Sequence, residues 1–104
     1  MKHSLIYITC ADEVEAERIA RALVEERLVA GVNLLPGARS VYRWQGKVET
    51  AAEVVLIAQT RTDLVERLTA RVVGLHSYEV PCVVAIPITS GNPAFLRWIE
   101  DETG

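Results

Sequence analysis

Strand-like and helix-like hydrophobic patterns follow one another along this chain in a fixed order, and that order limits the fold more than any other feature. Runs of β-branched and aromatic residues indicate strands, whereas apolar residues spaced three and four apart indicate helices. The patterns predict strands over residues 5–9, 31–44, 48–60 and 82–88, and helices over residues 13–28 and 62–74. The order is therefore strand, helix, strand, strand, helix, strand.

The second and third strands are expected to form one long hairpin. Pro36-Gly37 interrupts the second strand and predicts a bulge or kink, and Gln45-Gly46 predicts the turn. Asn92-Pro93 predicts the start of a short helix near the C-terminus, because proline is favoured at the first helical position. Together these elements predict an α+β fold: a ferredoxin-like split βαβ sandwich (βαββαβ, antiparallel sheet) with a long hairpin and a short C-terminal helix.

Length and hydropathy bear on domain organisation and assembly. A chain of 104 residues has the size of a single domain, expected over residues 1–104. A domain this small buries a limited fraction of its surface, yet half of its residues are hydrophobic and its mean hydropathy is +0.19. We therefore expect part of the apolar surface to face another subunit.

Charge and hydropathy also exclude several classes of protein. The chain has 11 Lys and Arg residues against 14 Asp and Glu residues, with no basic block, so no nucleic-acid partner is expected. No apolar run approaches the roughly 20 residues that span a bilayer, and the first residues become polar too early for a signal peptide. Two cysteines are too few for a disulfide scaffold. We expect a cytoplasmic protein without a membrane partner.

The polar residues offer one suggestive pair and two isolated thiols. His76 and Glu79 stand three residues apart and could share a metal ion or a proton, or His76 could instead interact with the C-terminal end of the second helix. Cys10 precedes a helix N-terminus, where a thiolate is stabilised, although a buried cysteine without a function fits the same position. Cys82 lies in an apolar run and is expected in the core.

Aromatic and charged residues gather near the turn of the long hairpin. These side chains could line a ligand pocket or contact a neighbouring subunit, and Trp44 is expected to be buried by a partner. The residues expected in a ligand cleft or subunit interface are Tyr42, Trp44, Lys47, Glu49 and, from a separate segment, Tyr78. No phosphate-binding loop, nucleophile elbow or metalloprotease signature is present, so no enzyme is predicted.

Five segments together resemble the CutA family of divalent-cation tolerance proteins, in the right order and over nearly the whole chain. The segments are ALVEERL at 22–28, VNLLPG at 32–37, YRWQGKVE at 42–49, HSYEVP at 76–81 and GNP at 91–93. The resemblance implies a ferredoxin-like protomer in a tight homotrimer, with long strands pairing between subunits and a shape similar to the PII signalling proteins. It also implies interaction with copper or other divalent cations, no cofactor required for folding, and ligand sites in the clefts between subunits.

The sequence departs from this family in two places. Many relatives have a cysteine where this chain has Gly31, and some have two histidines where it has Leu75-His76. Only His76 therefore carries over as a metal ligand.

Three hypotheses about function follow. The first is a non-enzymatic homotrimer that binds copper through His76 and Glu79. The second is a PII-like sensor whose intersubunit cleft, lined by Tyr42, Trp44 and Tyr78, binds an organic anion or a nucleotide. The third is a structural trimer without a ligand.

Overall fold

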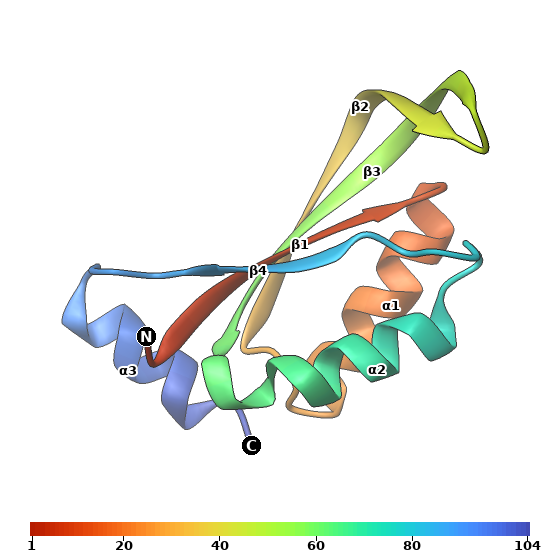
Figure 1. Ribbon diagram of the computed structural model, residues 1–104. Helices are drawn as coiled ribbons and strands as arrows, with labels where there is room; N and C mark the ends of the chain where they lie inside the picture. Colours follow the sequence, from red (N-terminus) through yellow and green to blue (C-terminus); the bar gives the residue numbers. More distant parts are fainter.

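The computed structural model describes residues 1–104 and has four strands and three α-helices (Figure 1). None of the helices is long and apolar enough to cross a membrane. In chain order the elements are β1 (His3–Cys10), α1 (Glu13–Glu25), β2 (Gly31–Trp44), β3 (Lys47–Arg61), a 3-10 helix (Thr62–Leu64), α2 (Val65–Leu75), β4 (Val83–Pro87) and α3 (Pro93–Asp101).

The strands form one sheet in the order β2-β3-β1-β4, in which every neighbouring pair is antiparallel. The two strands that are central in the sheet, β3 and β1, are thus far apart in the sequence, as in a split βαβ arrangement. This confirms the predicted ferredoxin-like α+β fold. In Figure 1 the β2–β3 hairpin rises well beyond the two helices, α1 and α2, that lie on one side of the sheet.

The hairpin contains the predicted irregularity. Its register changes between Leu35, opposite Val55, and Ala38, opposite Glu53, so β2 carries one residue more than β3 at this point. Gly37 has a φ of 87° there, a conformation that glycine adopts without strain. The turn also falls where predicted, because Gln45 and Gly46 both have positive φ, as a two-residue hairpin turn requires.

The core lies between the sheet and α1 and α2. Every second residue of β1 is buried, and the same alternation continues on β3 from Val54 to Thr60. Alternation of this kind places one face of a sheet against helices. On the helices the buried positions include Ala16, Ile19 and Leu23 of α1 and Leu68 and Val72 of α2.

Both long helices differ from the prediction at their ends. α1 ends at Glu25 instead of residue 28, because Arg27 adopts a φ of 59° and turns the chain. The segment predicted to start the second helix is a separate 3-10 turn without a side-chain cap, and its Asp63 pairs with Arg61, at 2.9 Å. α2 then continues through Gly74 as far as Leu75.

Candidate functional site

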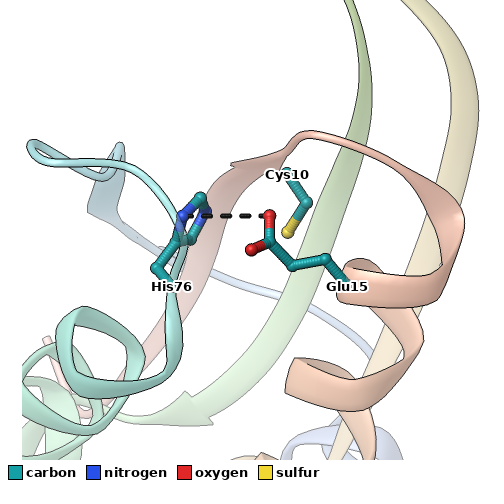
Figure 2. Close-up of side chains that lie close together, drawn as sticks. All are labelled: Cys10, Glu15 and His76. Carbon is teal, nitrogen blue, oxygen red and sulfur yellow. Dashed lines mark ion pairs between the residues drawn. The ribbon is translucent and has the colours of Figure 1, made fainter.

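Three side chains with metal-binding chemistry meet at one end of the helical layer (Figure 2). Cys10 is the last residue of β1, Glu15 lies in the first turn of α1, and His76 directly follows α2. One ligand atom from each residue lies within 4.8 Å of those of the other two. A sulfur, a nitrogen and an oxygen donor from three separate segments are therefore brought together by the fold.

Glu15 holds two loops together. Asp12 caps α1 by accepting a hydrogen bond from the Glu15 N–H, which fixes the first helical turn. The Glu15 carboxylate accepts hydrogen bonds from the N–H groups of Ala11, at 3.1 Å, and Ser77, at 2.9 Å. Burial alone would raise the pKa of this carboxyl group, but hydrogen bonds from Ser77 and Ala11 outweigh burial and lower the pKa. The charged form is thus the one that the site stabilises.

His76 uses both ring nitrogens within the chain. Its Nε2 lies 2.7 Å from the carbonyl oxygen of Thr9 and must donate to it, while Nδ1 accepts a hydrogen bond from the Tyr78 N–H at 3.1 Å. The side chain has no exposed surface, and its Nδ1 lies 3.9 Å from Glu15. His76 is the C-cap residue of α2, as one interpretation of the sequence expected, and its N–H donates to the carbonyl oxygen of Val72, but its ring reaches across to β1. The imidazole is therefore held in one orientation by partners at both ring nitrogens.

Cys10 is buried, as one of its two interpretations expected, whereas Cys82 differs from its expectation. Cys10 is completely buried, and burial, with smaller contributions from the charges of Glu15, Glu53 and Asp12, raises the pKa of its thiol to about 12. The thiolate considered from the sequence is therefore not the resting form. Cys82 lies only partly buried in the wall of a cavity, not in the core, and burial raises the pKa of its thiol as well.

Glu15 was missed by the sequence analysis. Its position carries a usable signal, because Glu15, Ile19 and Leu23 are spaced four apart and so lie on the buried stripe of α1. A carboxylate in line with two core residues predicts a buried acid with a specific partner.

A cavity of about 760 Å³ lies next to this cluster, under the hairpin. Tyr42 and Trp44 of β2 and Tyr78 and Glu79 of the segment before β4 all line it, together with Glu53 of β3. Tyr42, Trp44 and Tyr78, three of the residues predicted to share one site, therefore meet in this cavity. Lys47 and Glu49 are exposed near the turn and do not line this cavity. Glu79 is likewise exposed and is not part of the buried cluster of Cys10, Glu15 and His76.

Comparison with known proteins identifies the family. The model of the CutA1 divalent ion tolerance protein family matches residues 4–102. The chain belongs to this family. It is 47% identical over 100 residues to the divalent-cation tolerance protein CutA of Thermus thermophilus, a match that covers 96% of this chain and 97% of that protein. The family is named for tolerance of divalent ions and not for an enzymatic activity.

Other CutA proteins are longer than this chain. Protein CutA of Mus musculus is 45% identical over 100 residues, which are 96% of this chain but 56% of the mouse protein. The chain thus spans about half the length of such relatives. Among solved structures, those of CutA from Thermus thermophilus and from Xylella fastidiosa both superpose with a TM-score of 0.96, at 46% and 43% identity. The matches cover 98% and 100% of this chain, and 99% and 100% of those chains.

Gly31 illustrates how this CutA chain departs from the pattern noted in the sequence. A Cβ atom at Gly31 would lie 3.1 Å from the ring of Trp98 and 3.3 Å from the Gln59 side chain. A side chain at this position would therefore be in tight contact with Trp98 of α3, and one of the two would have to shift slightly.

Proposed function

We propose that this CutA chain is a non-enzymatic homotrimer that binds copper and thereby contributes to tolerance of divalent cations, with His76 as the central ligand. The observation that carries the proposal is the convergence of Cys10, Glu15 and His76, whose donor atoms lie within 4.8 Å of one another. Glu79, three residues after His76, is proposed as a further carboxylate ligand from the exposed side of the same segment.

The donor chemistry fits copper better than it fits calcium or magnesium. Thiolate and imidazole ligands suit copper, whereas calcium and magnesium prefer oxygen ligands alone. Binding would replace the thiol proton of Cys10. It would also replace one of the two hydrogen bonds of the His76 ring, either the one from the Tyr78 N–H or the one to the Thr9 carbonyl oxygen. The buried ring and the two hydrogen bonds of Glu15 keep the ligands in place before binding.

Copper titration by calorimetry tests this site. Wild type is expected to bind copper. Removing a hydrogen-bond partner of a metal ligand typically lowers metal affinity by roughly 10- to 100-fold. His76→Ala and Cys10→Ser each remove a ligand itself and are expected to lower the affinity by more than that. Glu79→Ala measures whether the second predicted ligand reaches the ion. The apparent affinity of the wild type is expected to rise with pH, because the Cys10 thiol, with a pKa of about 12, must lose its proton.

His3→Ala is the matched control for this titration. His3 is the other histidine of the chain and also lies near a carboxylate, with Nε2 2.8 Å from Glu100. Loss of copper binding in His3→Ala, or equal heats in wild type and His76→Ala, would contradict the proposed site.

The uncovered face of the sheet supports assembly into an oligomer. Residues paired directly across strands share a face, and the registers put Tyr7, Ile57 and Val84 on the face opposite the helices. Leu35 and Ile86 lie on this face too and are 46% and 48% exposed. The edge strands β2 and β4 have unpaired backbone groups along one side. An apolar face with free edges is the kind of surface that other copies of a chain cover.

Light scattering on the eluted protein tests the assembly. A homotrimer is expected to have three times the 11.5 kDa mass of one chain. A mass equal to a single chain at micromolar concentration would contradict the trimer while leaving the copper site open to its own test.

We also infer that the protein works in a reducing compartment such as the cytoplasm. Both cysteines are free thiols in the structure. Free thiols in a protein without disulfides are typical of compartments kept reduced by glutathione or thioredoxin.

A further inference from the structure

Glu53 is a buried carboxylate without a cationic partner in its own chain. It is 8% exposed, and its only hydrogen bond comes from the Tyr78 hydroxyl, 2.7 Å from Oε2. None of the ion pairs in the structure involves Glu53. A buried negative charge is costly unless a positive charge or several hydrogen bonds compensate it. Within the chain, one neutral hydroxyl is the only donor to this carboxylate.

The surroundings of Glu53 have the composition of a site for a positive charge. The cavity of about 760 Å³ that it lines also contains the rings of Tyr42, Trp44 and Tyr78, and Glu79 contributes a second carboxylate. No lysine, arginine or histidine lines this cavity. Aromatic faces attract cations through their negative quadrupole, most strongly in tryptophan. Three aromatic rings and two carboxylates without a basic residue therefore favour a cationic ligand and disfavour the organic anion considered from the sequence.

The cavity is also less suited to a metal ion than the neighbouring cluster is. The Tyr78 hydroxyl stays protonated, because burial and its hydrogen bond to Glu53 raise the pKa of the phenol. The Cys82 thiol in the wall stays protonated for the same main reason, burial. Apart from the two carboxylates, the side-chain donors here are thus neutral, and rings that cannot act as ligands occupy much of the wall. A cation with an apolar body makes better use of such a wall than a compact metal ion does.

We propose that this cavity binds a small organic ammonium ion, with Glu53 as the counter-ion and Tyr42, Trp44 and Tyr78 as aromatic walls. Its volume falls within the range of small-molecule sites, and its lining is mainly apolar with a few fixed polar groups. Tyr78 has two roles in this site: its ring forms part of the wall, and its hydroxyl holds the Glu53 carboxylate in place. The proposal does not depend on copper binding, because none of Cys10, Glu15 and His76 lines the cavity.

Tryptophan fluorescence with butylammonium chloride as the probe tests this site. The chain has two tryptophans, so the Trp98→Phe background leaves Trp44 as the only reporter. We expect a saturable change with butylammonium and none with sodium butyrate, which has a similar apolar body and the opposite charge. Glu53→Gln keeps the shape and an acceptor for Tyr78 but removes the charge, and is expected to weaken binding by about tenfold or more. Glu66→Gln, which removes the same charge from an exposed position of α2, is expected to bind like the parent protein.

Three results would overturn the proposal. The first is equal binding of butylammonium by the Glu53→Gln protein and its parent, and the second is equal binding of butyrate and butylammonium. The third is the absence of any saturable change together with dissociation of the Glu53→Gln assembly, since a basic side chain from another copy would then be the partner of Glu53. Copper titration of the same Glu53→Gln protein should give the wild-type result, which separates this site from the copper site.

Discussion

Replacing Glu15 with alanine is expected to lower the free energy of unfolding by about 3 kcal/mol or more, since each hydrogen bond to a charged acceptor contributes about 1.5 to 3 kcal/mol. The carboxylate joins the start of α1 to the segment after α2 through the N–H groups of Ala11 and Ser77. Its side chain is only 7% exposed, so solvent screens these bonds little. Urea unfolding of wild type and variant measures the difference.

Acid titration gives this prediction a second readout. The pKa of Glu15 is lower in the folded chain than its ordinary value of 4.5, so its contribution is fully present above that value and is lost as the pH falls through the folded pKa. The stability difference between wild type and Glu15→Gln should therefore narrow on acidification. Glu17→Ala, an exposed glutamate on the same helix, should stay within about 0.5 kcal/mol of wild type. Equal losses in Glu15→Ala and Glu17→Ala would contradict the role of Glu15.

Replacing Trp44 with alanine is expected to cost about 3 to 5 kcal/mol in the assembled protein, as for other buried aromatic side chains. In the single chain Trp44 is 38% exposed near the hairpin turn, where a partner subunit would cover it. Light scattering over a dilution series should show dissociation to single chains at a higher concentration than in wild type.

Two variants separate loss of the ring from loss of apolar surface in general. Trp44→Phe keeps an aromatic ring and should retain most of the assembly. Val14→Ala removes apolar surface from a residue of α1 that is 80% exposed and should have no effect. An unchanged dissociation profile in Trp44→Ala would place this ring outside the interface.

The fold could be predicted from the sequence because its elements have clear local signals. The apolar alternation from Val54 to Thr60 and the spacing of Ile19 and Leu23 each depend on residues that are near neighbours in the chain. The C-terminal end of α1 could not be predicted in this way, because it depends on contacts between residues far apart in the sequence. Arg27 adopts its unusual φ where its guanidinium donates to the carbonyl oxygens of Asp101 and Gly104, more than 70 residues away.

The candidate site was predictable only in part, for a related reason. His76 attracted attention as a residue type with metal chemistry, but its neighbours Cys10 and Glu15 lie more than 60 positions earlier in the sequence. Nothing in the local pattern pairs them. Likewise, the sequence showed aromatic residues on the hairpin but not that Glu53 would be buried among them without a basic partner.

The extra residue at the bulge of β2 changes which residues of this strand share a face of the sheet. Before the bulge, Leu35 shares the face of Val55; after it, Tyr42 and Trp44 share the face of Glu49 and Lys47. The face opposite α1 and α2 thus carries odd-numbered residues of β2 before the bulge and even-numbered residues after it, because side chains alternate along a strand and the bulge adds one residue. Deleting Gly37 would make the pairing regular and leave both rings on this face, because the turn still places Tyr42 opposite Glu49 and Trp44 opposite Lys47. A strict odd–even count along β2 from its first residues would therefore place Tyr42 and Trp44 on the helix-covered face, which is the wrong one.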